Sequence, residues 1–288
     1  MRSHFTISEL CDALDVSRSS YHAAQTRPES DRSKANAKLL QKMKIIHQHR
    51  HTRSYGSLRM TRLLLNQGIP CSKNRIAQLM RTHSMRARPR RPYRPKTTQP
   101  DHAAHPSPNL LAKAGRPQSP GTQIVSDITY IPTAEGWLYL AVVIDLFSRS
   151  ILGWKVAESL HSKVVADALS LAVGSGLVAK NAIFHSDQGC QYSSSQIRNL
   201  LNHFNLRQSM SAKGYCYDNA FAESAFASIK NEVLPDNHRF QSRQEATLAL
   251  FDYFETFYNR RRLHSSLGYQ TPEAFLNQYF QNQNPSLN

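Results

Sequence analysis

The 288-residue sequence is poor in cysteine, and its four cysteines lie far apart. No two of them form a CxxC pair, which argues against a disulfide framework and against a cysteine zinc site. Free thiols are therefore expected at Cys11, Cys71, Cys190 and Cys216. The sequence also lacks an apolar run of about 18 residues and an apolar N-terminal signal region. We expect a cytoplasmic protein without a membrane segment.

Acidic residues are scarce in the first part of the chain. Residues 1–120 contain 23 Lys and Arg against 6 Asp and Glu, whereas residues 121–288 contain 13 against 14. The whole formal net charge of +16 therefore comes from the N-terminal part. Clustered positive charge is typical of a surface that meets a polyanion, so we expect this part to bind nucleic acid. The alternative is a solvated basic surface.

A small helix-turn-helix is predicted at residues 1–30. Ser8 and Ser17 can each cap a short helix. Apolar side chains expected to face inward are Leu10, Leu14 and Val16. The second helix would carry Arg18 outward, towards a DNA groove. A pair of capped helices is common, so the pattern alone is only moderately specific.

A second helical, DNA-binding module is predicted at residues 34–85. Apolar side chains recur at helical spacing over residues 38–49, and a helix over residues 57–66 is followed by a turn. Ser72 then caps a further helix whose outer face carries side chains that can pair with base edges. The predicted DNA contacts on this helix are Lys73, Asn74 and Arg75. A merely soluble outer face is the alternative.

Residues 86–119 are predicted to form a basic, proline-rich linker. Eight of the 14 prolines of the chain lie between Pro89 and Pro120. Pro89, Pro92 and Pro95 recur at every third position, which favours an extended polyproline conformation and a stretched row of cations along a phosphate backbone. The predicted DNA contacts in this row are Arg86, Arg88, Arg90, Arg91, Arg94 and Lys96. The alternative is an inert spacer.

Residues 120–280 have a mixed α/β pattern. A β-branched strand at residues 123–132 is followed by two strands joined by a turn at residues 145–149, and then by helix, strand, helix, strand and helix. Three antiparallel strands followed by alternating helices and strands is the order known from ribonuclease-H-like cores. We therefore predict an α/β fold with a mixed five-stranded sheet and flanking helices, preceded by small all-α helix-turn-helix modules.

Three carboxylates occupy rigid positions in this pattern. Asp127 lies in the first strand, Asp187 at the end of the fourth, and Glu223 in the first turns of the last helix, on the same flank as Lys230. Carboxylates that converge from rigid elements suit two magnesium or manganese ions about 4 Å apart. Each acid also has an ordinary explanation, as a turn residue or an exposed helix residue. A fourth acid, Asp145, is expected to be structural because it lies where a strand enters its hairpin turn.

At these residues the chain resembles the insertion sequence 3 family of transposases. The three acids, with 35 residues between the last two, look like the DDE motif of an integrase core. The resemblance also includes DITYI, VVIDLFSR, HSDQGCQY, SMSAKGYCYDNAFAES and YNRRRLHSSLGYQTPEAF, while YGSLRMTRLLL resembles the family's second helix-turn-helix. It covers most of the chain. Two positions depart from the family's usual pattern, Ile124 and Ala225, where aromatic side chains are common.

The resemblance implies a transposase that cuts the ends of a mobile element and joins them to target DNA. Asp127, Asp187 and Glu223 would bind two Mg²⁺ ions, for which Mn²⁺ can substitute, and Lys230 would position the DNA end. The partners would be double-stranded DNA, namely element ends and target. Holding two ends together implies a homo-oligomer on DNA. Family members often act as a frameshift fusion, so an upstream-frame partner or fusion is also expected.

A second interpretation stays open at this stage. The chain could be a DNA-binding regulator or an inactive partial product that occupies element ends without chemistry. Nuclease activity would separate the two interpretations. A retroviral-type integrase is disfavoured because its paired His and Cys zinc module has no counterpart among the scattered cysteines.

Overall fold

The computed structural model describes residues 5–89, 107–211 and 220–283, with the side chains described from residue 223 onward in the last range. The chain divides into two compact units, Met1–Ile46 and His47–Asn288. The predicted division into residues 1–30, 34–85, 86–119 and 120–280 does not coincide with these units.

The first unit begins with two short helices, α1 (Ile7–Ala13) and α2 (Arg18–Thr26). Thr6, and not the predicted Ser8, caps α1. Its side chain accepts a hydrogen bond from the backbone N–H of Glu9, and the Glu9 carboxylate accepts from the backbone N–H of Thr6 at 2.7 Å. This reciprocal pair is a capping box, which satisfies two otherwise unpaired donors. The predicted cap of α2 is confirmed, because Ser17 Oγ accepts from Ser20 N–H at 3.1 Å.

The turn between α1 and α2 corrects a prediction about burial. Leu14 and Val16 are 72% and 46% exposed, although both were expected to face inward. The reason is that α1 ends before them. Leu14 is the C-cap, and Asp15 has a positive φ of 52°, which turns the backbone away from the helical direction. Within α1 the buried residue is Cys11.

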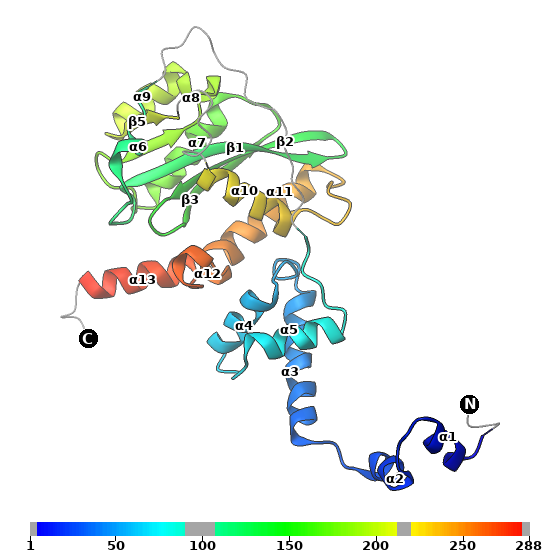
Figure 1. The fold of residues 1–288 in the computed structure, drawn as a ribbon. Helices are drawn as coiled ribbons and strands as arrows, with labels where there is room; N and C mark the ends of the chain where they lie inside the picture. The colour runs from blue at the N-terminus through cyan, green and yellow to red at the C-terminus, as the bar shows by residue number, and fades with distance from the viewer. Residues whose placement is uncertain (1–4, 90–106, 212–219, 284–288) are drawn as a thin grey trace. The chain divides into compact units, whose positions relative to one another are not determined.

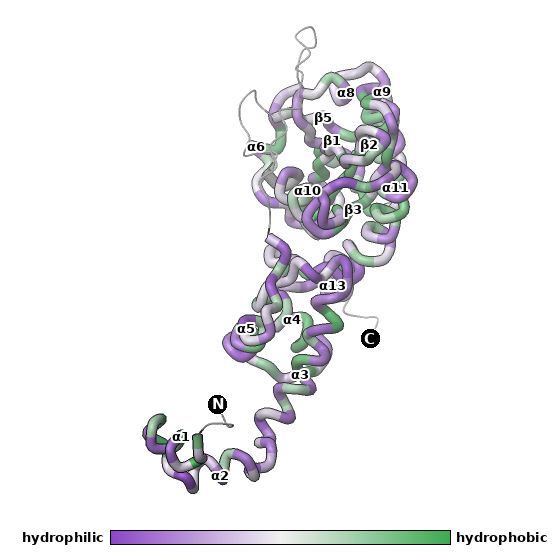
Figure 2. The backbone as a smooth tube through the Cα atoms, turned by 90° about the vertical axis from the view of Figure 1, so that its right-hand side faces the viewer, coloured by the Kyte–Doolittle hydropathy of each residue, from purple (hydrophilic) through white to green (hydrophobic). Residues whose placement is uncertain are grey.

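Three helices follow, as the sequence predicts, although the first begins seven residues before the predicted stretch of residues 38–49. They are α3 (Asp31–Gln48), which crosses from the first unit into the second, α4 (Ser57–Asn66) and α5 (Lys73–Thr82). Ser72 caps α5 by accepting from Arg75 N–H at 3.3 Å, as predicted. The buried stripes of α4 and α5 include Met60, Leu64, Ile76 and Leu79. Figure 2 shows both hydrophilic and hydrophobic segments on α4 and α5, which is typical of amphipathic helices.

The second unit contains the predicted five-stranded mixed sheet. Its strands are β1 (Gln123–Thr133), β2 (Gly136–Asp145), β3 (Ile151–Ala157), β4 (Ile183–Ser186) and β5 (Arg207–Met210). They lie in the order β3-β2-β1-β4-β5. The first three strands are antiparallel neighbours, whereas β4 is parallel to β1 and β5 is parallel to β4. The predicted fold is confirmed strand by strand.

Helices cover both faces of this sheet (Figure 1). One face packs against α7 (Ser162–Gly174) and α9 (Ser195–His203), and the other against α10 (Ala220–Val233), α11 (Arg243–Asp252) and the π-helical turn η1 (Tyr253–Tyr258). A Cβ at Gly153 of β3 would lie 2.2 Å from the carbonyl oxygen of Ala168, so glycine permits the close approach of α7.

Four short elements and a longer C-terminal helix, α13, complete the described part of the second unit. They are α6 (Leu111–Ala114), α8 (Cys190–Ser193), α12 (Asn259–Arg261), the 3₁₀ turn η2 (Ser265–Leu267) and α13 (Pro272–Gln283). Of the helices in the described ranges, none combines the length and the apolar composition that a bilayer crossing requires.

Residues before α4 pack directly into the sheet-containing part of the second unit. Tyr55 is fully buried in the cluster that α10, α11 and η1 form on the sheet, and its hydroxyl accepts from Leu263 N–H at 3.1 Å. His51 Nε2 lies 2.9 Å from Asp252 Oδ2. The sequence did not predict these contacts. They explain why residues 47–89 belong to the same compact unit as the sheet.

Candidate active site

Asp127 in β1 and Asp187, the residue directly after β4, lie at matching positions relative to the pairing of these two strands. The parallel register of β1 and β4 pairs Val125 with His185, and each aspartate lies two residues further along its own strand direction. Since side chains two residues apart in a strand project to the same face, this register brings the two carboxylates to one place. Asp187 directly follows the last residue of β4, as the sequence predicted.

A glycine orients the carboxylate of Asp187. The backbone N–H of Gly189 donates to Asp187 Oδ1 at 3.0 Å. A Cβ on Gly189 would lie 3.0 Å from that same oxygen and 3.1 Å from Gln191 Oε1, which is tighter than ordinary van der Waals contact. The absence of a side chain therefore permits both the hydrogen bond and the position of the carboxylate. Asp127 is held locally as well, because its Oδ1 accepts from the N–H of Ile128 at 2.7 Å.

Two tyrosines lie close to both aspartates. Burial raises the pKa of Tyr192 well above its ordinary value, and the negative charges of Asp127 and Asp187 raise it further. The Tyr192 hydroxyl lies 3.0 Å from Ser126 Oγ. Burial also raises the pKa of Tyr130, with smaller contributions from Tyr139 and Asp187. Both phenols are therefore protonated at neutral pH and add no negative charge beside the carboxylates.

The sequence had not singled out Tyr130. Its alternation along β1 places it on the opposite face from Asp127, so the pattern gave no reason to join the two. The available signal was its short separation from Asp127 in the strand.

Lys230 on α10 lies near Asp127. Burial lowers the pKa of Lys230 to about 8, and the carboxylate of Asp127 opposes this change by favouring the charged form. The structure thus brings together the strand acid and the helix cation that the sequence assigned to one site.

Glu223 is the predicted site residue that the structure does not bring to the pair. It is exposed in the first turn of α10, directly after the stretch 212–219 that the structure does not describe. Within the described part of the chain, no group of three or more His, Cys, Asp or Glu side chains is arranged to hold a metal ion. The two aspartates by themselves are a fitting start for such a site, because they converge from rigid strands and offer the hard oxygen donors that divalent cations such as Mg²⁺ prefer.

Comparison with known proteins places the chain in a family. Integrase core domain models match residues 117–216 and 205–272, and an HTH-like domain model matches residues 34–93. The transposase of insertion sequence element IS904 from Lactococcus lactis is 40% identical over 82% of this chain and 92% of the relative. Transposase InsF of insertion sequence IS3A from Escherichia coli is 37% identical over 96% of each. The chain belongs to the insertion sequence 3 family of transposases.

Membership of this family defines the general type of reaction that the protein catalyses. As a transposase with an integrase core, the protein is an enzyme of DNA cleavage and strand transfer that acts in DNA transposition and integration. No finding favours the alternative of a regulator without catalysis. Among solved structures, a chain of a simian T-cell lymphotropic virus intasome in complex with PP2A regulatory subunit B56 gamma is similar at 14% identity. The TM-score is 0.47 over 83% of this chain and 74% of that chain.

Asp145 of the transposase is a turn residue, as the sequence predicted. Its side chain is 1% exposed. Oδ1 accepts from Gly121 N–H at 2.9 Å, and Oδ2 accepts from the backbone N–H and the hydroxyl of Ser148 at 2.8 and 2.6 Å. With these donors satisfied inside the fold, Asp145 stabilises the β2–β3 turn.

The predicted DNA contacts fall into three groups. Those with exposed side chains are Arg18, Lys73, Asn74 and Arg86, and Arg75 is partly exposed. Those outside the described residues are Arg90, Arg91, Arg94 and Lys96.

Besides Lys230, described above, the remaining predicted DNA contact is Arg88, which is engaged within the protein. Its guanidinium donates to the carbonyl oxygens of Asn231 at 3.1 Å, Pro235 at 2.7 Å and Leu234. These carbonyls belong to the C-terminal end of α10 and the residues that follow, where a cation is favourable. Arg88 therefore stabilises the C-terminal end of α10, and the structure favours this role over the predicted contact with a phosphate.

Proposed function

We propose that this transposase cuts and joins DNA at a site formed by Asp127, Asp187 and Glu223, the set expected to hold two Mg²⁺ ions, with Mn²⁺ as a substitute. The observation that carries the proposal is the matched position of Asp127 in β1 and Asp187 directly after β4. When bound, the cations would activate the attacking hydroxyl or water and stabilise the leaving oxygen of a phosphodiester. Glu223 would complete the set from the exposed first turn of α10.

The surrounding residues would position the reacting groups. Gly189 N–H orients Asp187 by its hydrogen bond, and the buried ring of Tyr192 excludes water from beneath the two aspartates. Lys230 lies on the same flank of α10 as Glu223, seven residues later, and its ammonium is near Asp127. We assign to Lys230 the electrostatic positioning of the terminal DNA phosphate, because a cation there offsets the charge of the acids and of the DNA.

DNA binding would use the basic N-terminal part. The outer face of α5 is proposed to contact DNA through Lys73, Asn74 and Arg75, where Lys73 and Asn74 are exposed. Further proposed contacts are Arg18, Arg86, Arg90, Arg91, Arg94 and Lys96. Since two element ends must be held at once, the proposal includes a homo-oligomer on DNA. It also includes an upstream-frame partner or fusion, which the family resemblance implies.

The carboxylate assignment is tested by Glu223→Gln with Glu273→Gln as its control. Both glutamates are exposed and lie in the first turn of a helix, α10 and α13 respectively. Strand transfer is measured with a labelled element end and Mg²⁺, and DNA binding is measured in parallel. We expect Glu223→Gln to abolish strand transfer without loss of DNA binding, Glu273→Gln to keep both, and EDTA to stop the wild-type reaction.

Two results would contradict the proposal. Strand transfer by Glu223→Gln at the wild-type rate would remove Glu223 from the site. A wild-type protein that binds element ends but neither cuts nor joins them with any divalent cation would favour the regulator.

A further inference from the structure

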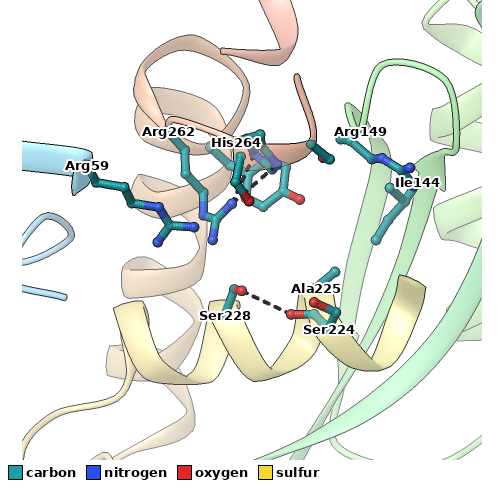
Figure 3. Close-up of a pocket in the computed structure, with 11 residues that line it drawn as sticks. Arg59, Ile144, Arg149, Ser224, Ala225, Ser228, Arg262 and His264 are labelled. Atoms are coloured by element: carbon teal, nitrogen blue, oxygen red, sulfur yellow. Dashed lines mark hydrogen bonds between the residues drawn. The ribbon is translucent and has the colours of Figure 1, made fainter. Parts of the chain in front are cut away.

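A cavity of about 230 Å³ lies beside α10, among residues that the proposed chemistry does not use. Figure 3 shows that three arginines reach it from different parts of the second unit. Arg59 comes from α4, Arg149 from the turn after β2, and Arg262 from the segment after α12. The cavity, hereafter the arginine pocket, is thus assembled by residues about 200 positions apart in the chain.

The charge of the arginine pocket is positive. Glu232 offsets part of it, since its carboxylate accepts from Arg262 Nε and Nη2 at 2.8 and 2.9 Å and lies 3.8 Å from Arg59 Nη1. The negative charge of Asp145 likewise offsets part of the positive charge of Arg149. Three guanidinium groups against these two carboxylates leave one positive charge, and neither carboxylate is among the residues that line the cavity.

His264 also lies close enough to the three arginines to be affected by their charges. Burial, together with the smaller effect of the positive charges of Arg262, Arg59 and Arg149, lowers the pKa of His264 to about 2. The ring is therefore neutral and accepts a hydrogen bond from Arg262 Nη1, whose distance to His264 Nε2 is 3.1 Å. The part of this shift that comes from Arg262, Arg59 and Arg149 reflects a positive potential at the ring, and the same potential favours a bound anion.

Hydroxyl groups line the entrance of the arginine pocket. Ser224, Ser265 and Ser266 are exposed, whereas Arg262 is 3% exposed and His264 is 7% exposed at its floor. Guanidinium and hydroxyl donors around an open cavity match the acceptor oxygens of a phosphate group. A carboxylate ligand would satisfy fewer of these donors.

The location relates the arginine pocket to the proposed active site. Ser224 directly follows Glu223, and Ser228 lies one turn later on the same flank of α10. At 3.6 residues per turn this flank lies roughly 100–160° around the helix from Glu223 and Lys230. A phosphate bound here would therefore lie beside the turn that carries the proposed third metal ligand.

We propose that the arginine pocket binds one backbone phosphate of DNA and holds that strand against α10. The inference rests on the proposed function, because it takes DNA as the polyanion that the enzyme must place near Glu223. The contact is independent of sequence, since phosphates carry no base information.

Arg149→Gln is the main test, because Arg59 and Arg262 also pair with Glu232. Arg198→Gln, at an exposed position on α9, removes the same charge elsewhere and serves as its control. Binding of a labelled duplex of random sequence is measured over a KCl series in EDTA. We expect Arg149→Gln to weaken binding roughly tenfold and to reduce the salt slope by about 0.9, the value for one lost phosphate contact. Arg198→Gln should leave the slope unchanged.

A second variant tests the arginine pocket even if Arg149→Gln fails to fold. Ser266→Asp places a carboxylate at the exposed entrance and should also weaken binding, while the melting temperature stays at the wild-type value. Unchanged affinity and slope in both variants would overturn the proposal.

The source of the phosphate is tested by inorganic phosphate at constant ionic strength. If it raises the melting temperature of the wild type but not of Arg149→Gln, while the DNA slope is the same in both, the pocket binds a small anion and the proposal is wrong. Because binding is measured without metal, these outcomes are separate from a failure of the carboxylate site, which strand transfer by Glu223→Gln tests.

Discussion

Replacement of Gly189 by alanine would separate catalysis from folding in this transposase. The backbone of Gly189 has φ −59° and ψ 144°, a conformation that alanine adopts without strain. Alanine also lowers the conformational entropy of the unfolded chain, which stabilises a protein by about 0.4–1 kcal/mol at compatible positions. The free energy of unfolding should therefore stay the same or rise slightly.

The added methyl group acts on the carboxylate of Asp187. It would lie 3.0 Å from Asp187 Oδ1 and 3.1 Å from Gln191 Oε1, where ordinary contact begins at 3.4 Å. One or both oxygens must move by a few tenths of an ångström, and the hydrogen bond from Gly189 N–H, now 3.0 Å, would weaken as Asp187 turns. A misplacement approaching 1 Å in a catalytic group lowers rates by about a hundredfold. For the smaller shift expected here, we predict a loss of roughly tenfold to a hundredfold in strand cleavage.

The assay compares Gly189→Ala with Gly174→Ala, since a Cβ at Gly174 would have no heavy atom within 4 Å. Cleavage of a labelled element end is measured with saturating Mg²⁺, and unfolding is followed by circular dichroism. Wild-type cleavage by Gly189→Ala would refute the orienting role of this glycine. A large loss of stability in Gly189→Ala would refute the argument that its backbone tolerates a side chain.

Other predictions concern stability of the second unit. Glu232→Gln and Arg262→Met should each lower the free energy of unfolding by about 3–5 kcal/mol, because each removes the nearest charged partner of a buried charge. The double variant should recover most of this loss, and additive losses in urea unfolding would contradict the prediction. His264→Gln should flatten the acid dependence of stability. In the wild type the pKa of His264 is about 2 in the folded state and 6.5 in the unfolded state, so the stabilisation by a neutral ring is fully present above pH 6.5. As the pH falls below 6.5, the unfolded ring takes up a proton and the free energy of unfolding falls by about 1.4 kcal/mol per pH unit. Equal slopes of the free energy of unfolding against pH for variant and wild type, between pH 6 and about 4, would contradict this cause. Tyr55→Phe should cost about 1–3 kcal/mol by leaving the buried N–H of Leu263 unpaired, and an unchanged melting temperature would show that this hydrogen bond contributes little.

Most elements of the fold were predictable from local patterns in the sequence. The strand at residues 123–132 was predictable because it is rich in β-branched residues, and Asp187 could be placed at a strand end because an apolar run stops just before it. The caps at Ser17 and Ser72 were predictable because a cap depends on residues within one turn. The structure confirms each of these.

Contacts between distant residues were not predictable in the same way. Nothing near Tyr55 indicates that its hydroxyl meets the backbone of Leu263, because the partner is 208 residues away. Arg88 belongs to a basic linker, where an arginine that donates to carbonyls looks the same in sequence as one that contacts phosphate. The three arginines of the arginine pocket also come from segments that share no local pattern.

The burial of Tyr55 has a consequence for studies of the integrase core in isolation. A fragment that starts at residue 120, where the sequence pattern changes to α/β, would lack an aromatic ring from its own interior. Loss of a buried large aromatic side chain costs about 3–5 kcal/mol, and the uncovered apolar surface would favour aggregation. A fragment that starts at residue 47 would keep this ring together with α4 and α5. The helix that carries Lys73, Asn74 and Arg75 and the sheet beside the two aspartates thus belong to one compact unit, and removal of the first would destabilise the second.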